Sequence, residues 1–280
     1  MQKRALAVHD ISCVGRCSLT VALPALSAAG VNTAVIPTAL LSTHTGEFQG
    51  YTHFDLSDQL RPITDHLSTL GLHYDAFYSG YLASGAQVEQ ILYMIDHLTD
   101  DKTHIFVDPA FADHGRRYSL IDEDMPRQMR RLIARADTIV PNVTEAAFLL
   151  DLPWAGESHD PETVREYCRR LIDLGPKNVI VTDVSLPTQP DKTGVAILTR
   201  DMQEAEFLFG TRYEGLFHGT GDVFASFMLA ALMKDLSPVE AARLSLDMTH
   251  EAIRLTLEDG EPLRYGLQFE RVLHRLYGLS

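Results

Sequence analysis

Short apolar runs alternate along the chain with longer stretches in which apolar residues recur every three or four positions. The short runs are continuous, with no polar position every second residue, and this pattern is typical of parallel strands that are covered on both faces. Each run is followed by a stretch of helical periodicity. The predicted strands are Ala5–Val8, Thr33–Pro37, Ala76–Ser79, His104–Val107, Thr138–Val140, Asn178–Thr182 and Gly194–Leu198.

The longer periodic stretches predict helices between these strands. They are Leu19–Ala29, Leu56–Leu70, Gln87–Leu98, Arg127–Arg135, Glu145–Leu150, Pro161–Leu174, Gly221–Met233 and Pro238–Leu257, with a last helix over Gln268–Leu276. A strand–helix alternation of this kind predicts an α/β fold with an open, mostly parallel sheet and helices on both faces. No internal repeat, low-complexity linker or charge block divides the chain, so we expect a single domain over residues 1–280.

Composition limits the classes of function. The 280 residues are 45% hydrophobic and 22% charged, which is ordinary for a globular protein. The formal net charge is −14, and this excess of acid argues against nonspecific binding to nucleic acid or to an anionic membrane. If such a protein handles phosphate groups, it must supply positive charge locally, through helix N-termini and metal ions.

Cysteine usage and the N-terminus point to the cytoplasm. Cys13, Cys17 and Cys168 are too few for a disulfide framework, and no second Cys/His pair with zinc spacing follows Cys13 and Cys17. The first ten residues contain no long apolar segment of the kind that signal peptides carry. No run approaches 18 apolar residues, so we expect no membrane span.

Polar and glycine-rich segments follow the predicted strands. In an open α/β sheet, ligands bind outside the carboxyl ends of the strands, so the candidate chemistry is expected at one edge of the sheet. These segments are His9-Asp10, Ser42 to Gly46, Ser79 to Tyr81, Asp108-Pro109, Pro141-Asn142 and Thr182-Asp183.

The most informative junction is Gly-Thr-Gly-Asp at 219–222, which runs directly into the apolar stretch Val223–Met233. A helix that begins there presents unpaired N–H groups and a partial positive charge, and the glycines let an anion approach the backbone. Asp222 adds a carboxylate beside this anion site. That combination suits an alcohol that loses its proton while it attacks a phosphoryl group. The alternative is an ordinary capped helix.

Taken together, these segments resemble the ribokinase-like superfamily and, within it, the pyridoxal kinase family. The resemblance covers nearly the whole chain. Its motifs are the Gly-Thr-Gly-Asp signature at 219–222, an N-x-x-E motif in 141–145, and stretches at 42–46, 79–81 and 107–109 that are similar to S-N-H-T, [ST]-G-Y and C-D-P. The order and spacing of the five segments make a chance match improbable.

The resemblance implies ATP-dependent phosphorylation of the 5′-hydroxymethyl group of a vitamin B6 vitamer, which is pyridoxal, pyridoxine or pyridoxamine. Asp222 would be the general base. Gly219, Thr220 and Gly221 would form the anion hole for the transferring phosphoryl group. ATP would be the co-substrate, Mg²⁺ the metal, and a homodimer the assembly, since members of the family commonly pair.

The same resemblance assigns the metal and nucleotide contacts. Asn142 and Glu145 of the N-x-x-E motif would organise magnesium and phosphate, although the same residues could instead cap a helix. Asp108 would have a magnesium or phosphate-network role, or would simply make an Asp-Pro turn. Thr182 and Asp183 would face the nucleotide phosphates.

Two aromatic residues have equally open alternatives. Phe224, just after the candidate base, would lie near the adenine or would belong to the core. Tyr81 would cover the substrate ring by stacking, or would be a core or rim tyrosine.

His44 and Thr45 would contact polar substituents of the pyridine ring.

The chain departs from the family pattern at two places. The family usually has D-P-V-M-G-D or D-P-V-L-G-D, whereas this chain has D-P-A-F-A-D from Asp108 to Asp113. Many members carry a Ser-His pair after the first strand, and an ungapped count back from Pro24 places His9-Asp10 there. The ring contact is therefore expected from His9, Asp10 or Ser12, and substrate preference can differ from pyridoxal.

Three other functions compete with this interpretation. Hydroxymethylpyrimidine kinase shares the Gly-Thr-Gly-Asp motif and acts on a similar heteroaromatic alcohol. A sugar or nucleoside kinase of the superfamily would usually insert lid strands after the first strand and carry Gly-Gly near residue 40. A catalytically silent nucleotide-binding regulator would have no reason to keep Asp222 beside an intact Gly-Thr-Gly.

Overall fold

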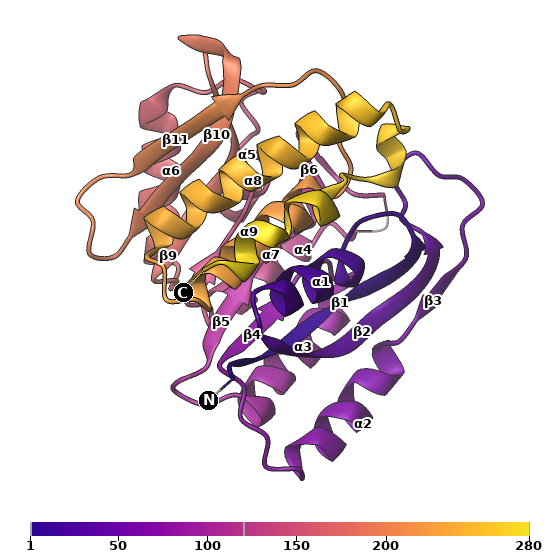
Figure 1. Ribbon diagram of the computed structural model, residues 1–280. Helices are drawn as coiled ribbons and strands as arrows, with labels where there is room; N and C mark the ends of the chain where they lie inside the picture. Colours follow the sequence, from indigo (N-terminus) through magenta and orange to yellow (C-terminus); the bar gives the residue numbers. More distant parts are fainter. Residues whose placement is uncertain (1, 120, 280) are drawn as a thin grey trace.

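The structure is a computed structural model that describes residues 2–119 and 121–279. Its main feature is a nine-stranded sheet in the order β11-β10-β9-β8-β5-β4-β1-β2-β3 (Figure 1). The strands are β1 (Arg4–Val14), β2 (Asn32–Thr43), β3 (His53–Asp55), β4 (Ala76–Ser79), β5 (His104–Val107), β8 (Thr138–Ile139), β9 (Asn178–Leu186), β10 (Gln189–Thr199) and β11 (Glu206–Thr211). A separate two-stranded sheet pairs β6 (Ala112–Asp113) with β7 (Arg116–Arg117).

The six strands from β9 through β8, β5, β4 and β1 to β2 pair in parallel. Antiparallel strands lie only at the edges, with β3 beside β2 and with β10 and β11 beyond β9. The carboxyl ends of the parallel strands therefore lie at one edge of the sheet, as the sequence predicts.

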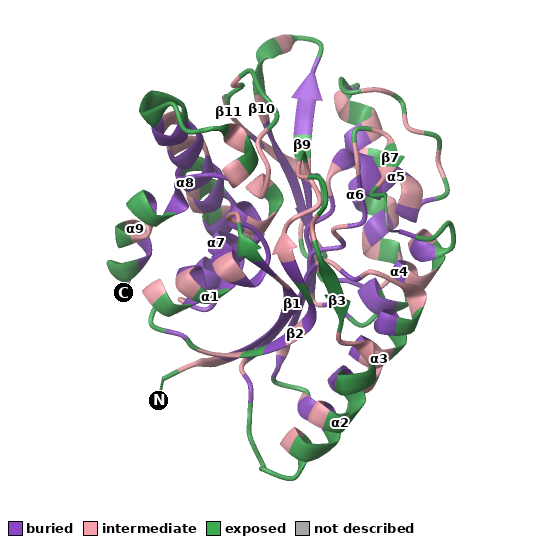
Figure 2. Cartoon of the chain, turned by 90° about the vertical axis from the view of Figure 1, so that its right-hand side faces the viewer, coloured by how far each residue is buried: buried purple, intermediate pink, exposed green. Residues whose placement is uncertain are grey.

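Helices cover both faces of the sheet (Figure 2). One layer contains α1, α7, α8 and α9, and the other contains α2 to α6. Their bounds are α1 (Leu19–Ala28), α2 (Ser57–Ser68), α3 (Gly85–Leu98), α4 (Met125–Ile133), α5 (Val143–Leu149), α6 (Pro161–Asp173), α7 (Thr220–Leu232), α8 (Pro238–Asp259) and α9 (His274–Tyr277). Two short 3₁₀ helices, η1 (Leu263–Tyr265) and η2 (Phe269–Val272), follow α8.

Two hydrophobic cores lie on opposite faces of the sheet. On β1, Leu6 and Val8 belong to the core under α2 to α6, whereas Ala5 belongs to the core under α1, α7 and α8. Alternate residues of this strand thus enter different cores, and every position from Ala5 to Val8 is apolar. This arrangement explains why the strand sequences are continuous and not alternating, and it confirms the predicted fold class.

The first two strands are longer than predicted. β1 continues to Val14 and β2 to Thr43, so His9-Asp10 and Ser42-Thr43 lie within strands and not after them. The sequence boundaries were wrong because they stopped at the first polar side chain. Polar residues can stay in a buried strand, and the register shift between His9 and Ile11 changes which side chains face which layer.

The C-terminal segment also differs from expectation. The helix predicted over Gln268–Leu276 is instead η2 followed by the single turn α9. The backbone N–H of Gln268 donates to Thr256 Oγ1 at 2.8 Å, which ties the segment to α8. Phe269 and Val272 are buried there, so packing on α8 overrides regular helical geometry.

The strands β3, β6, β7 and β11 were not predicted. Three of them have two or three residues, too few for a periodic signal. Among the described residues, no helix has the length and apolar character needed to cross a membrane.

Candidate active site

Four acidic side chains meet at the carboxyl edge of the sheet. Asp10 comes from β1, Asp108 follows β5, Glu145 lies in α5 and Asp222 in the first turn of α7. The charges of Glu145 and Asp222 both act on Asp108, and the charge of Asp10 acts on Asp222. The tertiary structure therefore brings together residues from distant parts of the sequence, in the part of the sheet where the sequence predicts a ligand site.

The Gly-Thr-Gly segment forms the turn into α7. Gly219 is the N-cap residue and has a left-handed backbone (φ 73°, ψ 8°). A Cβ added there would lie 2.1 Å from the backbone oxygen of Arg16, so only glycine fits this turn. Thr220 Oγ1 donates to Phe217 O at 2.9 Å, which fixes the turn from inside. At Gly221 a Cβ would meet nothing within 4 Å, so the N-terminus of α7 is open to a ligand.

Asp222 carries a pKa suited to a general base. Burial of its carboxyl group raises the pKa from 3.8 to about 7, and the negative charge of Asp10 adds to this rise, while the backbone N–H of Ser18 opposes the shift. A group with a pKa near neutrality is ionised often enough to accept a proton and basic enough to hold it. A simple helix cap would not need this environment.

Ser18 links the two carboxylates on this side of the site, and sequence reasoning missed it. Its hydroxyl donates to Asp10 Oδ1 at 2.5 Å, and its backbone N–H acts on Asp222. Its backbone has φ 50° and ψ −130°, which is strained for a residue with a side chain. A serine directly before the helix that starts at Leu19 was the available signal, since serine is a common N-cap residue.

Asp108 is the carboxylate that best suits a cation. It is buried, and its pKa is raised well above the usual range by burial and by the charges of Glu145 and Asp222. A divalent cation would relieve this repulsion. The described residues contain no group of three or more His, Cys, Asp or Glu side chains around one point. Magnesium commonly takes only one or two carboxylates, together with water and substrate phosphates, so the residues present fit such an ion.

Asn142 and Glu145 form a complete capping box at the start of α5. Asn142 Oδ1 accepts the N–H of Glu145 at 2.9 Å, and Glu145 Oε2 accepts the N–H of Asn142 at 3.0 Å. The helix-capping role left open by the sequence is therefore correct. It does not by itself remove a role beside magnesium.

His9 and Ser12 are buried polar residues of β1. Both are fully buried, and within the described structure neither ring nitrogen of His9 and no atom of the Ser12 hydroxyl group has a hydrogen-bond partner. His9 packs edge-on against Tyr78 at 4.2 Å and sits directly under Gly80. Burial lowers its pKa to about 3. His9 is thus neutral and lies against Gly80, and Asp10 is the next residue of the strand.

His44 is already engaged by protein groups. Its Nδ1 accepts the N–H of Gly46 at 3.1 Å, so its Nε2 carries the proton and donates to Arg264 O at 2.6 Å. His218 pairs with Glu47 at 2.9 Å. The loop that contains Thr45 is therefore fastened both to η1 and to the segment before the anion hole. Thr45 itself is half-buried in this loop.

Of the remaining residues predicted to contact a ligand, three are at least partly accessible and one is packed in the core. Tyr81 is half-buried next to Asp10, whose charge contributes with burial to raising its pKa to about 12. The backbone N–H of Thr182 donates to the backbone oxygen of Pro141, just after β8. Asp183 is exposed with a left-handed φ of 58° inside β9. Phe224, by contrast, packs in the core under α7, which favours the core alternative.

The D-P-A-F-A-D departure does not disturb the backbone where the family glycine is lost. Ala112 takes that position, lies in β6 and is fully buried with no positive φ. The positive φ of this loop is at Ala110 instead (43°). A glycine is therefore not required at position 112 in this chain.

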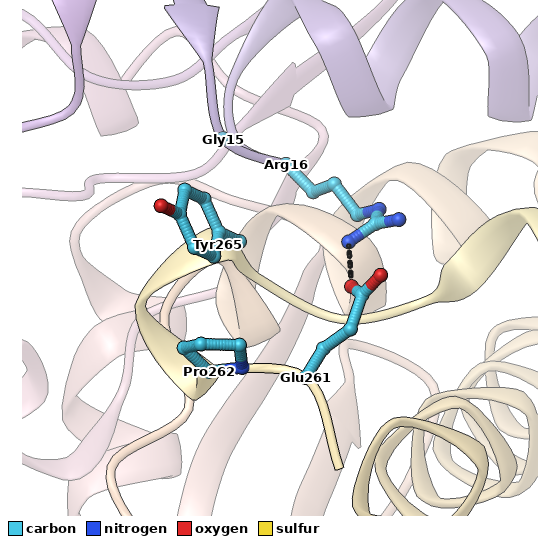
Figure 3. Close-up of a pocket in the computed structure, with 5 residues that line it drawn as sticks. All are labelled: Gly15, Arg16, Glu261, Pro262 and Tyr265. Atoms are coloured by element: carbon cyan, nitrogen blue, oxygen red, sulfur yellow. Dashed lines mark hydrogen bonds and ion pairs between the residues drawn. The ribbon is translucent and has the colours of Figure 1, made fainter. Parts of the chain in front are cut away.

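A separate pocket of about 360 Å³ lies next to this site (Figure 3). It is lined by Gly15, Arg16, Glu261, Pro262 and Tyr265, and Arg16 Nη1 pairs with Glu261 Oε2 at 3.2 Å across it. None of the four acidic side chains lines this pocket. The four acidic side chains are therefore grouped outside this cavity.

Comparison with known proteins identifies relatives over nearly the full length. The family model described as phosphomethylpyrimidine kinase matches residues 21–264. A proposed phosphomethylpyrimidine kinase from Bacteroides thetaiotaomicron, crystallised with pyridoxal, is 35% identical with a TM-score of 0.94, covering 100% of this chain and 97% of that one. The pyridoxal kinase of Lactobacillus plantarum is 29% identical with a TM-score of 0.90, covering 100% and 98%. The pyridoxal kinase of Aliivibrio fischeri is 25% identical, covering 85% and 84%.

The range that the family model matches spans the anion loop at 219–222 and the N-x-x-E motif at 142–145. The fold of the neighbours is also the one predicted from the strand and helix pattern. The chain therefore belongs to the phosphomethylpyrimidine kinase family and, with the pyridoxal kinases, to the ribokinase-like superfamily.

Proposed function

We propose that the protein is an ATP-dependent kinase that phosphorylates the 5′-hydroxymethyl group of a vitamin B6 vitamer. The observation that carries this proposal is Asp222, whose pKa is about 7 in the first turn of a helix with an open anion site. A base placed beside an anion hole matches the two needs of phosphoryl transfer to an alcohol.

The residues divide the work between the alcohol and the phosphate. Asp222 accepts the proton of the substrate hydroxymethyl group as the oxygen of that group attacks the γ-phosphorus of ATP. The bond from the γ-phosphorus to the bridging oxygen breaks, and ADP leaves. The N–H groups of Gly219, Thr220 and Gly221 hold the oxygens of the transferring group. Asp108, with water and the nucleotide phosphates, would hold Mg²⁺, and the ion, when bound, neutralises charge on those phosphates. Thr182 and Asp183 would lie on the nucleotide side.

The substrate class is supported by the relatives. Two of them are pyridoxal kinases, and a third was crystallised with pyridoxal. The second candidate is hydroxymethylpyrimidine phosphorylation, because the hydroxymethylpyrimidine/phosphomethylpyrimidine kinase of Bacillus subtilis is a relative that is 28% identical over 68% of this chain. Both substrates are heteroaromatic rings with a hydroxymethyl group, so the catalytic arrangement serves either of them.

A coupled ADP-release assay with pyridoxal, pyridoxine, pyridoxamine and hydroxymethylpyrimidine tests the proposal. We expect kcat/KM to be highest for a B6 vitamer. A preference for hydroxymethylpyrimidine would support the second candidate. Activity with sugars or nucleosides alone would refute both.

We also propose that the protein is a cytoplasmic homodimer. The proposal of a dimer is supported by two apolar side chains near one edge of the sheet: Leu40 on β2 lies opposite Phe54 on the edge strand β3, and their exposed fractions are 43% and 65%. Exposed apolar side chains of this size on an edge are typical of contact surfaces.

The pH dependence of kcat/KM should show the titration of Asp222. Only the ionised carboxylate can accept the proton, so activity is expected above the pKa of about 7 and should fall about tenfold per pH unit below it. Because the charge of Asp10 raises this pKa, Asp10→Asn should move the acid limb to lower pH. Initial rates between about pH 5 and 9 measure it. An acid limb that stays in place in that variant would show that Asp10 does not act on the base.

Thr45 offers a test of substrate recognition. If its hydroxyl bonds a ring substituent, Thr45→Ala should raise the KM for the vitamer about tenfold, the effect of one lost hydrogen bond, while the KM for ATP is unchanged. Thr45→Ser keeps the hydroxyl and serves as the control. If ATP binding weakens and vitamer binding does not, our assignment is wrong, and ATP and the vitamer bind in each other's proposed places.

A further inference from the structure

The Glu145 carboxylate accepts hydrogen bonds from backbone N–H groups, two of which lie in a distant part of the chain. Its Oε1 accepts the N–H of Phe111 at 2.7 Å and that of Ala112 at 3.2 Å, while its Oε2 accepts the N–H of Asn142 at 3.0 Å. The residue is 1% exposed. A carboxylate has about four acceptor positions, so three of them are used without any ligand.

Neighbouring residues of the same motif hold the same loop. Asn142 Nδ2 donates to Ala112 O at 2.8 Å, and Thr144 Oγ1 accepts the N–H of Gly115 at 3.0 Å. The motif therefore binds the segment 111–115 through side chains at three of its four positions. Capping of α5 alone would need only the bonds between Asn142 and Glu145.

The segment that is held has an unfavourable backbone. Ala110 has φ 43° and His114 has φ 47°, a region that residues other than glycine rarely adopt. Each such residue persists only when surrounding contacts determine it. Asp108 begins this segment and is 7% exposed, so the position of its carboxylate depends on how the following residues are held.

We propose that Glu145 is a positioning residue: it clamps residues 108–115 so that the Asp108 carboxylate stays at the phosphate end of the site. The clamp acts in the protein without metal or nucleotide. Its kinetic consequences rest on the function proposed above, whereas the clamp itself does not. The competing interpretation is that Glu145 serves as a direct magnesium ligand.

Glu145→Gln separates the two interpretations. The glutamine side chain can direct its oxygen either to the N–H groups of Phe111 and Ala112 or to the N–H group of Asn142. Its NH₂ group must then face the remaining donors, with which it cannot form the same hydrogen bonds. In metal-free protein, hydrogen exchange at Phe111 and Ala112, or at Asn142, should therefore speed up by about tenfold, as expected for a lost hydrogen bond. A residue that acts only as a metal ligand would leave all three amides unchanged without metal.

The chain contains a matched control. Ser237 and Glu240 form a second complete capping box at the start of α8, exposed and without a clamped loop. Glu240→Gln should speed exchange only at its own helix end and leave kcat unchanged. Comparison of the two variants separates loss of a helix cap from loss of the clamp.

Kinetics and rescue complete the test. Glu145→Gln should lower kcat about tenfold or more while the vitamer KM changes less than about twofold. Ala110→Gly removes the penalty for a positive φ, so it should recover at least about threefold of the lost kcat in the Glu145→Gln background. A metal ligand would not be restored in this way.

A second variant covers the case in which Glu145→Gln does not fold. Thr144→Val keeps the shape of the side chain and removes only the bond to Gly115, whose exchange should accelerate in metal-free protein. The proposal is overturned if the amides of residues 111, 112 and 142 keep their protection from exchange in Glu145→Gln. It is also overturned if Ala110→Gly restores none of the lost kcat. Where only Thr144→Val folds, unchanged protection of the Gly115 amide overturns it. If the protein proves not to be a kinase, the exchange measurements still decide whether the clamp exists.

Discussion

Asp222→Asn is expected to lower kcat by roughly 10²–10⁴-fold, the usual contribution of a general base. Asparagine keeps the size of the side chain and its place in the first turn of α7, but it cannot accept the proton of the attacking alcohol. Burial raises the pKa of Asp222 to about 7, which suits that transfer, and Asp222 lies in the first turn of the helix that begins with the anion loop. Steady-state rates with saturating ATP and vitamer measure the loss.

Nucleotide binding provides the control for this variant. Since the substitution leaves the N–H groups of the anion loop in place, the dissociation constant for ATP should change by less than about threefold. Asp183→Asn, at an exposed position in β9, is the comparison variant: it shows how far the loss of a carboxylate on the proposed nucleotide side changes the dissociation constant for ATP. Near-normal turnover of Asp222→Asn would remove the proposed mechanism.

Gly219→Ala is expected to cause the second largest loss, roughly 10²–10³-fold in kcat, comparable to removal of oxyanion-hole donors. The added Cβ would lie 2.1 Å from the backbone oxygen of Arg16, and alanine disfavours the φ of 73°. Relief of this contact requires the turn or the Arg16 backbone to move, and we expect a displaced turn to misalign the N–H groups of the loop with the phosphoryl group. Turnover and thermal unfolding should be measured together.

Gly30→Ala is the matched control for backbone strain. Gly30 has a similar φ of 77°, but its Cβ would meet nothing within 4 Å, and it follows α1 at the opposite end of that helix from Ser18. Both variants should lose stability of about 1 kcal/mol from the left-handed backbone, whereas only Gly219→Ala should lose turnover. Equal turnover losses in the two variants would attribute the effect to stability and not to the anion hole.

The sequence determined the fold class and the place where the helix that carries the candidate base begins. Apolar runs without alternation predicted strands between two helical layers, and the bounds of β4 and β5 match the structure. The Gly-Thr-Gly-Asp segment predicted the start of α7 because glycine geometry and helix termini are local properties. Local preferences are encoded within a few residues, so they can be read without the rest of the chain.

Strand ends and long-range bonds were decided only by the tertiary structure. The sequence could not show that His9 lies in a bulged strand under Gly80, since burial of a polar side chain depends on the layers above and below it. Nor could it show that Phe224 turns into the core and away from the ligand edge. Helical periodicity leaves the direction of a single side chain open until its neighbours are known.

The hydrogen bonds that hold the site follow the same rule. Ser18 reaches Asp10 within the β1–α1 turn, and Glu145 reaches Phe111 across 34 positions. Donors and acceptors of this kind are present in almost every segment, so composition does not reveal which pairs will form. The sequence by itself determined which chemical groups the site contains, through local motifs. Only the packing of the two helical layers on the sheet decided which of those groups lie together at the carboxyl edge of the sheet and which hold the backbone in place.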